Sequence, residues 1–448
     1  MGSGHSGPLS TGLFLVLLAP AAQLSALAPA SVAQDPDVFL GATAVLFDNA
    51  TVIDGRGGQP RPNSAILVWN GRIQAVGSRS RLQVPEGTAI IDLEGAYVVP
   101  GFIDAHATPR VARTLADMLA AGVTGVREAA MPLADFEARG RAPLGDEPLP
   151  AVFIGGAVLD AEGGPGLALG SADDIDAAVR RLIDVDGAAF VSVSPSIPAE
   201  WIIPLARETR RRDTPVWVDG RGAGWLTRVR AGADVTSHLI SGDPDMLPVT
   251  DRPAAYGSPA SSRVDVAGWL SALDPAGEPV RRAVDALLSR DAAVVPMLAV
   301  AEAELPCVSR DRPCDPTANR AERGRSSWSK AQALVRFLHH EGVRLLVGSG
   351  SPDETIAGDG FHRELRLLVE AGIPSLDVLS MATRNAAIAL GILHDRGTLE
   401  AGKRADFVVL DANPVEDIEA ARSVSFVVLE GKGWRPLAEG GFERLRFR

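Results

Sequence analysis

Lysine is nearly absent from this chain of 448 residues. Only Lys330, Lys403 and Lys432 occur among its 44 basic residues, so arginine carries almost all of the positive charge. Acidic residues outnumber basic ones, the formal net charge is −12, and no basic run occurs. Nucleic-acid binding needs clustered cations that displace counterions from phosphates, so this charge pattern excludes nucleic acid as the expected partner.

Long apolar runs are also missing. The most apolar stretch, Gly12–Ala19, is followed by Pro20 and is far shorter than the ~20 residues that a membrane-spanning helix needs. It lies within residues 1–33, which contain no Asp, Glu, Lys or Arg and end in the small-x-small sequence Ser31–Ala33. This pattern is typical of a secretory signal peptide. We therefore expect an exported protein, periplasmic or extracellular, without a transmembrane span in the mature chain; whether the segment is cleaved or stays as an anchor is open.

Cysteine is scarce too. The two cysteines, Cys307 and Cys314, lie in a segment rich in Pro, Asp and Arg. In an exported protein, two cysteines this close predict a disulfide, which would contribute about 2–3 kcal/mol on the chain-entropy model. Zinc binding by the two thiols is the alternative, and no histidine nearby in the sequence would complete such a site.

Both ends of the chain are rich in strand patterns. Ala44–Tyr97 contains alternating apolar segments separated by Gly-, Pro- and Asn-containing turns, and the same character returns after Gly397. We therefore predict one small β-sandwich-like domain, built from residues 38–97 and 397–448 together.

Residues 98–396 alternate strand and helix patterns, which is typical of a parallel sheet covered by helices. Eight strands fit a (β/α)8 TIM-like barrel, whose functional residues gather at the C-terminal ends of the strands. A doubly wound open sheet would need a Gly-rich phosphate loop near its start, and none follows the first strand. The expected fold class is therefore α/β, a barrel plus the composite β-domain. The eight candidate strands are Val98–His106, Val123–Arg127, Ala151–Gly155, Phe190–Ser194, Val216–Asp219, Asp234–His238, Ala293–Leu298 and Leu345–Gly348.

Four segments resemble the amidohydrolase superfamily. Asn70–Gly77 is similar to the family's N-terminal β-domain, Pro100–His106 to its strand one, Ala120–Glu128 to its strand two, and Glu370–Ile418 to its C-terminal signature. The pattern looks closest to the imidazolonepropionase- and prolidase-like branch. The resemblance implies a hydrolase of non-peptide C–N bonds, in which a divalent metal activates a water and an aspartate on strand eight moves the proton.

The family's ligand set is His-x-His on strand one, a carboxylated lysine on strand four, a histidine on each of strands five and six, and the strand-eight aspartate. Carried over by this resemblance, His106 and His238 are kept, and Asp219 replaces the strand-five histidine. The other three positions are lost, and the residues there are Thr108, Ser192 and Gly350.

A count of histidines supports this loss without an alignment. Of the seven, only His106 and His238 lie at the ends of candidate strands, and none of the three lysines lies on one. The usual binuclear metal site is therefore excluded. The remaining five histidines are His5 in the signal segment, His339 and His340 at the end of a helix, His362 at the start of the next helix, and His394 before the β-domain.

Two interpretations of the remnant site stay open. His106, Asp219 and His238 could form a mononuclear site for one divalent metal, zinc, iron or manganese. Alternatively, both histidines are hydrogen-bonded interior residues, with Asp219 orienting one of them. Asp104, two residues before His106, is expected to be a structural carboxylate inside the barrel. The loop carboxylates Asp160, Glu162, Asp353 and Glu354 are expected to be solvated surface charges.

We therefore expect a degenerate amidohydrolase, a pseudoenzyme whose barrel mouth binds a small molecule without turnover. The alternatives are an active hydrolase with a rebuilt mononuclear site, and a non-catalytic scaffold that binds a protein partner. The sequence assigns no catalytic residue, no organic cofactor and no substrate, and it leaves the oligomeric state open.

Overall fold

The computed structural model describes nine stretches of the chain, all within one compact unit formed by residues 41–448. The predicted signal segment 1–33 lies outside the described residues and stays a prediction. None of the described helices is both long and apolar enough to cross a membrane. The described stretches are residues 44–108, 112–129, 148–161, 166–219, 224–239, 242–251, 265–308, 318–350 and 358–446, with no description of the side chains of 112, 219 and 318–320.

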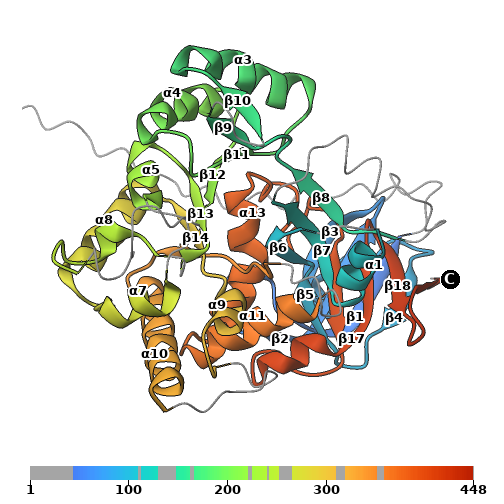
Figure 1. Ribbon diagram of the computed structural model, residues 1–448. Helices are drawn as coiled ribbons and strands as arrows, with labels where there is room; N and C mark the ends of the chain where they lie inside the picture. Colours follow the sequence, from blue (N-terminus) through green and yellow to red (C-terminus); the bar gives the residue numbers. More distant parts are fainter. Residues whose placement is uncertain are drawn as a thin grey trace, which may run out of the picture. The chain divides into compact units, whose positions relative to one another are not determined.

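Eight parallel strands form the barrel (Figure 1). Three pair in the order β6-β7-β8, and five pair as β11-β12-β13-β14-β15. Two backbone hydrogen bonds join these groups: Ala105 N–H to Val347 O at 2.8 Å, and Ala189 N–H to Ile154 O at 2.8 Å. The predicted TIM-like barrel is thereby confirmed. Its strands are β6 (Phe102–Ala107), β7 (Val123–Glu128), β8 (Ala151–Ile154), β11 (Val191–Val193), β12 (Val216–Asp219), β13 (Val235–Ser237), β14 (Ala293–Val295) and β15 (Arg344–Leu345).

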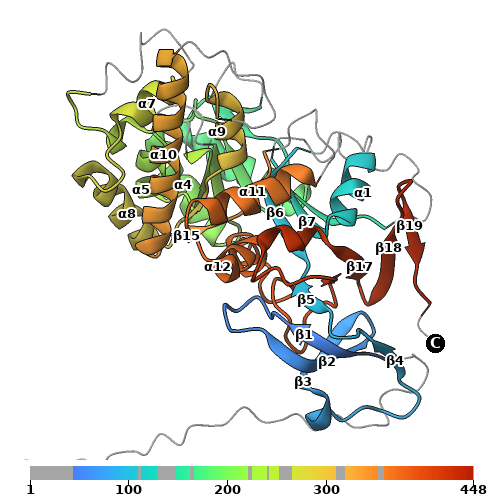
Figure 2. The same ribbon diagram turned by 90° about the horizontal axis from the view of Figure 1, so that it is seen from below.

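A nine-stranded sheet joins the two ends of the chain. Strand β5 lies at its centre, parallel to β1 and antiparallel to β16, so the early strands and the late strands lie on either side of it (Figure 2). The predicted composite β-domain is thereby confirmed, while its exact boundaries stay a prediction. The strands are β1 (Val45–Val52), β2 (Arg61–Trp69), β3 (Arg72–Ser78), β4 (Ala89–Asp92), β5 (Tyr97–Pro100), β16 (Phe407–Leu410), β17 (Val424–Leu429), β18 (Lys432–Pro436) and β19 (Phe442–Arg444).

Aromatic contacts hold the two halves of this sheet together. The rings of Phe47 and Phe407 meet edge to face, with centroids 5.0 Å apart, and both side chains are fully buried. Phe426 packs against Phe47 from the late strand β17, at a centroid distance of 6.4 Å. Edge-to-face contacts stabilise beyond the apolar area that they bury, so residues from both ends share one core.

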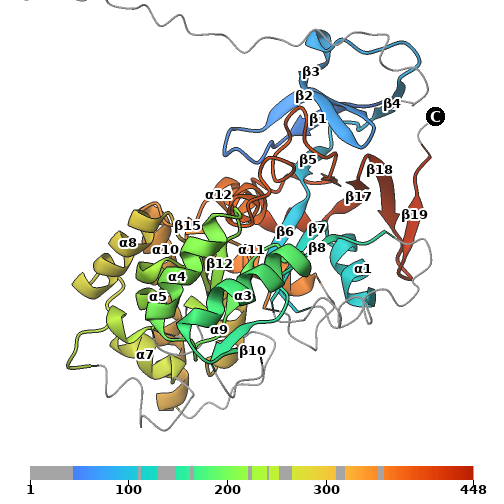
Figure 3. The same ribbon diagram turned by 90° about the horizontal axis from the view of Figure 1, so that it is seen from above.

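Helices cover the outside of the barrel. Helices α3, α4, α5 and α8 follow one another along it (Figure 3). In α8, the buried residues Val280, Ala283, Val284 and Leu287 form one apolar stripe at helical spacing. The α-helices are α1 (Ala112–Ala120), α3 (Ile175–Val179), α4 (Ala199–Arg210), α5 (Trp225–Ala231), α7 (Val266–Ala272), α8 (Glu278–Arg290), α9 (Leu298–Glu304), α10 (Ala318–His340), α11 (Asp359–Glu370), α12 (Ser375–Ser380) and α13 (Ala386–Ala389).

Several short elements complete the chain. Strands β9 and β10 extend the second barrel sheet beyond β11, and neither was predicted. The short elements are β9 (Leu159–Ala161), β10 (Leu167–Leu169), the 3-10 helices η2 (Arg79–Arg81), η3 (Ala172–Asp174), η6 (Pro244–Met246) and η8 (Ile418–Arg422), and the π-helices η4 (Arg180–Val185) and η7 (Met381–Asn385).

Strand one departs from its predicted bounds. The segment predicted as one barrel strand, Val98–His106, is divided at Gly101 into β5 of the composite sheet and β6 of the barrel. A Cβ atom at Gly101 would collide with the side chain of Thr124 on β7. Glycine therefore permits the close approach at which the chain passes from one sheet to the other.

Apolar side chains fill the barrel interior. Phe190, Trp217, Val235 and Leu346 are at most 1% exposed and belong to one core cluster. The barrel is thus a packed core.

Candidate functional site

The structure brings the two strand-end histidines into contact. His106 lies on β6 and His238 directly follows β13; they are 6% and 7% exposed. Their ring centroids are 4.9 Å apart, and the ring planes meet at 83°. His238 has a φ of +58°, a backbone conformation that residues other than glycine rarely adopt. Such conformations often occur at functional positions. Asp219 ends β12, but its side chain lies outside the description, so the three-residue metal site stays a prediction.

A buried arginine that the sequence analysis missed lies beside His106. Arg127 on β7 is 3% exposed, with Nη1 3.3 Å from His106 Nδ1 and Nη2 donating to Ser192 Oγ at 3.0 Å. Its guanidinium carbon is 4.4 Å from the ring centroid of Phe190 and 4.3 Å from that of Trp217. The side chain therefore spans from strand one to strand four across aromatic faces that favour a cation.

Asp104 lies below His106 on the same strand. Its Oδ1 accepts hydrogen bonds from the backbone N–H groups of His106, at 3.0 Å, and Ser349, at 3.1 Å. Complete burial raises the pKa of Asp104, although hydrogen bonds from Ser349 and His106 and the charge of Arg127 oppose this rise. These bonds connect strand one to the segment after strand eight, which agrees with the structural role expected for this carboxylate.

The segment after strand eight has no room for a side chain at Gly350. Its φ is +74°, and a Cβ there would lie 2.5 Å from Val300 Cγ2 and 2.8 Å from Met297 Cε. Its N–H donates to His106 O at 2.9 Å, which fixes the backbone in this position. The absence of an acid here is therefore built into the backbone path as well as the residue type.

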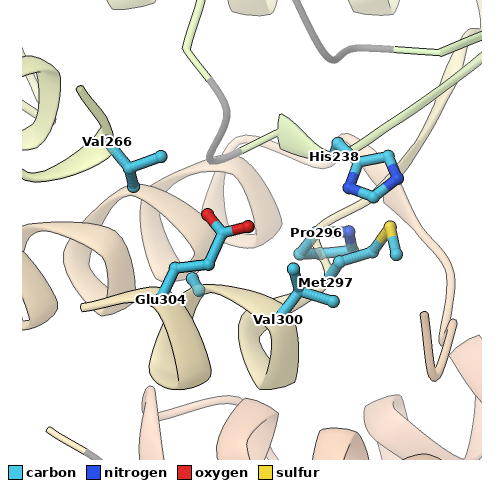
Figure 4. Close-up of a pocket in the computed structure, with 7 residues that line it drawn as sticks. His238, Val266, Pro296, Met297, Val300 and Glu304 are labelled. Atoms are coloured by element: carbon cyan, nitrogen blue, oxygen red, sulfur yellow. The ribbon is translucent and has the colours of Figure 1, made fainter. Parts of the chain in front are cut away.

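A small cavity opens beside His238. It has room for about one water molecule, and His238 and Glu304 lie at opposite sides of it with Met297 and Val300 between them (Figure 4). Its exposed walls carry both polar and apolar atoms, so it offers hydrogen-bonding as well as van der Waals contact. The lining residues are His238, Val266, Pro296, Met297, Val300, Ala301 and Glu304.

A buried carboxylate fixes the helix that forms one wall of this cavity. Glu364 on α11 is fully buried and accepts hydrogen bonds from the first N–H groups of α9, from Leu298 at 2.9 Å and Ala299 at 2.7 Å. Burial raises the pKa of Glu364 to about 7, although these hydrogen bonds oppose the rise. Met297, just before α9, adopts a φ of +59° and lines the cavity.

Comparison with known proteins assigns this architecture. Residues 308–433 match the model of the amidohydrolase family, and this range contains the segment Glu370–Ile418 whose resemblance the sequence showed. A crystal structure of a Xaa-Pro dipeptidase with bound methionine superposes with a TM-score of 0.66 at 19% identity, covering 88% of this chain and 100% of that one. A putative prolidase from Bifidobacterium longum gives 0.66 at 21% identity, with 90% and 96% covered.

Residues 308–433 are similar to the amidohydrolase family, and most of the chain shares the fold of these two solved structures. Among curated proteins, an adenine deaminase of Klebsiella pneumoniae (strain 342) is 48% identical over 82 residues, which are 18% of this chain and 13% of the deaminase. The match thus spans about an eighth of that relative's length, while the solved amidohydrolases share the fold over most of this chain.

Amidohydrolases usually hold divalent metal, and the described residues do not fit one. They contain no group of three or more His, Cys, Asp or Glu side chains placed to bind a metal ion. At one lost ligand position, the hydroxyl of Ser192 accepts a hydrogen bond from Arg127. At another, Gly350 has a positive φ of +74° and no side chain. Thr108 follows β6 and offers only a neutral oxygen.

Other predicted residues have mixed outcomes. Asp160 was expected to be solvated, and this was wrong, because it is 3% exposed and accepts hydrogen bonds from Ser196 Oγ and Ala161 N–H. Burial raises its pKa, but bonds from Ser196, Ser194 and the backbone outweigh this and lower it. Three other loop carboxylates lie outside the described residues: Glu162, Asp353 and Glu354. Cys314 lies outside them too, so its disulfide to Cys307 stays a prediction.

Proposed function

We propose that this amidohydrolase-superfamily protein binds a small molecule at the mouth of its barrel and does not hydrolyse it by the metal-dependent route. Hydrolysis of C–N bonds is the activity that its family implies. The observation that carries the proposal is Gly350, where the family places the aspartate that moves the proton. No other observation bears on the chemical step as directly, because that step needs a base within hydrogen-bond reach of the water.

The described carboxylates near Gly350 do not replace the missing aspartate. Asp104 uses Oδ1 to accept two backbone N–H groups, and Glu364 uses both oxygens to cap α9. Each is fully buried; Glu364 binds backbone N–H groups with both oxygens, and Asp104 does so with Oδ1 while its Oδ2 has no hydrogen-bond partner among the described residues. Moving either one to a bound water would leave buried N–H groups without an acceptor, at a cost of about 1–3 kcal/mol each.

The cavity beside His238 marks the place at the barrel mouth where the ligand is proposed to bind. It has room for about one water molecule, far below the range of about 300–1,000 Å³ typical of drug-sized ligands, so binding there requires its wall side chains to move. His238 and Glu304 offer polar contacts at the two sides, and Met297 and Val300 offer apolar contact between them (Figure 4). The ligand expected is therefore a compact molecule with polar groups at its ends.

A turnover assay tests the loss of hydrolysis. The purified protein is incubated with adenine, an Xaa-Pro dipeptide and N-acetylated amino acids, each with Zn²⁺ or Mn²⁺ added. We expect no more product than from the His106→Gln/His238→Gln double variant. Product that this double variant fails to make would contradict the proposal and favour an active mononuclear site.

A cavity-filling variant tests the binding. Val300→Phe fills the cavity, and Ile203→Phe, on the exposed face of α4, serves as a control that introduces the same side chain away from it. Small molecules that raise the melting temperature of the wild-type protein are expected to lose this effect in Val300→Phe and keep it in Ile203→Phe. Ligands that bind both variants equally would place binding elsewhere.

We also propose that the protein is exported, on the uncharged segment 1–33. A reporter enzyme active only outside the cytoplasm, fused after residue 40, is expected to be active and to lose activity when Gly12–Ala19 is deleted.

Export supports the disulfide between Cys307 and Cys314. Alkylation followed by mass spectrometry is expected to find both cysteines protected until a reductant is added, and a labelled thiol without reductant would contradict this.

A further inference from the structure

We propose that the guanidinium of Arg127 holds the place of the divalent metal in this barrel and excludes metal ions from the two remaining histidines. This inference concerns the interior of the site, and it stands whether or not a ligand binds in the cavity beside His238.

The position of Arg127 is the first support. In the family, a histidine on strand one and the carboxylated lysine on strand four hold the metal. Here the same two positions, His106 and Ser192, both contact the Arg127 guanidinium, at 3.3 Å and 3.0 Å. The cation thus bridges the strands that a metal would bridge. The rings of Phe190 and Trp217, with centroids 4.4 Å and 4.3 Å from the guanidinium carbon, favour the cation at this position.

The charges around the site change together. The family site balances its metal with two anions, the carboxylated lysine and the aspartate. Ser192 and Gly350 carry no charge, so those two anions are gone, and a divalent ion would lack them. A single positive charge needs less compensation, and the buried Asp104 is attracted to Arg127. A monovalent internal cation therefore suits this set of residues better than a metal ion does.

The hydrogen bond to His106 supplies a separate argument. A guanidinium carries only donors, so in this contact Arg127 donates and His106 Nδ1 accepts. Neutral His106 then carries its proton on Nε2. A metal needs a lone pair on a ring nitrogen, and both nitrogens of His106 are in use. Arg127 thereby turns a metal ligand into a hydrogen-bond donor.

Metal binding to matched variants tests the exclusion. Arg127→Met removes the charge and keeps an unbranched side chain over Phe190 and Trp217, while Arg228→Met removes a different buried arginine, on α5. Equilibrium dialysis with Co²⁺ or Zn²⁺ is expected to show no specific binding to the wild type or Arg228→Met. Because the repulsion between a +1 and a +2 charge a few ångströms apart is removed, Arg127→Met is expected to bind about a hundredfold tighter or more.

Two results would overturn the proposal. One is a wild-type protein that binds one equivalent of metal and loses it in His106→Gln. The other is an Arg127→Met variant that folds, as judged by its melting transition, and binds metal no better than Arg228→Met.

A spectroscopic measurement keeps the proposal testable if Arg127→Met fails to fold. In wild-type protein labelled with ¹⁵N-histidine, His106 is expected to show a pyrrole-type Nε2 and a pyridine-type Nδ1, with His106→Gln identifying its signals. Addition of Zn²⁺ is expected to leave both signals unchanged. The opposite tautomer, or a shift at one equivalent of Zn²⁺, would refute the role of Arg127. Neither measurement depends on turnover, so a failure here is distinct from a failure of the proposed function.

Discussion

Replacing Gly350 by alanine tests whether the end of strand eight has room for any side chain. The substitution adds one methyl group at a φ of +74°, 2.5 Å from Val300 Cγ2 and 2.8 Å from Met297 Cε. The left-handed backbone costs alanine roughly 1–2 kcal/mol relative to glycine. Overpacking against the branched side chain of Val300 adds about 1–3 kcal/mol, because the flexible end of Met297 can move aside more easily. We expect Gly350→Ala to lower the free energy of unfolding by about 2–5 kcal/mol.

Gly342→Ala is the matched control. Gly342 lies just before β15 with a φ of +85°, and an added Cβ there would meet nothing within 4 Å. It should therefore show only the backbone cost, about 1–2 kcal/mol. Urea denaturation followed by circular dichroism measures both variants, and the difference between them reports the collision.

A double-mutant cycle completes this test. Val300→Ala removes the nearest methyl group, so Gly350→Ala should cost less in that background than in the wild type. Equal losses of stability for Gly350→Ala and Gly342→Ala, with no coupling to Val300, would refute the reasoning. The backbone would then accept a side chain, and the missing acid would be explained by the residue type at Gly350 alone and not by a lack of space.

Three further predictions concern buried carboxylates and metal. The pKa of Glu364 is raised to about 7 in the folded protein, from an unfolded value near 4.5. Its contribution to stability is therefore full below pH 4.5 and is lost as the pH rises through about 7. Urea denaturation from pH 4.5 to 8 should show a loss in the free energy of unfolding on the order of 3 kcal/mol, and this loss should be absent in Glu364→Gln. A wild-type profile no steeper than that of Glu364→Gln would contradict it. Asp104→Ala leaves two buried N–H groups without an acceptor and should lower the free energy of unfolding by about 2–6 kcal/mol in the same assay. The control Asp92→Ala, at an exposed position, should lower it by about 1 kcal/mol or less. Similar losses of stability for the two variants would argue against a structural role for Asp104. Finally, neither a chelator nor added Zn²⁺ should change the melting temperature, and a rise at one equivalent would show a metal site.

Much of the fold could be predicted from the sequence because its signals are local. Each of the eight predicted barrel strands corresponds to a strand of the barrel, since apolar runs between helical patterns are typical of buried parallel strands. The division of Val98–His106 at Gly101 was not predictable, because it depends on contact with Thr124, which comes from another strand. Strands β9 and β10 are three residues each, too short to give a periodic pattern.

The candidate site was predictable only where a rare residue marked it. Histidine is scarce here, so His106 and His238 could be singled out at strand ends. Arg127 gave no such signal, because arginine makes up nearly all of the basic residues and most of them are surface charges. The available clue was position, since β7 is buried at all six residues and a charge within it needs a partner. Gly350 was recognised as a lost acid, but its φ and lack of space required coordinates.

The central place of β5 in the composite sheet has a consequence for synthesis of the chain. Strand β5 pairs with β16 from a segment roughly 300 residues later, so the sheet cannot close until almost the whole protein has left the ribosome. Until then β5 presents an unpaired edge, the kind of surface that recruits other chains into aggregates. A truncation anywhere in the barrel would therefore leave both the barrel core and the core of the composite sheet incomplete. Residues made late in synthesis, such as Phe407, are needed to complete the packing of the strands made first.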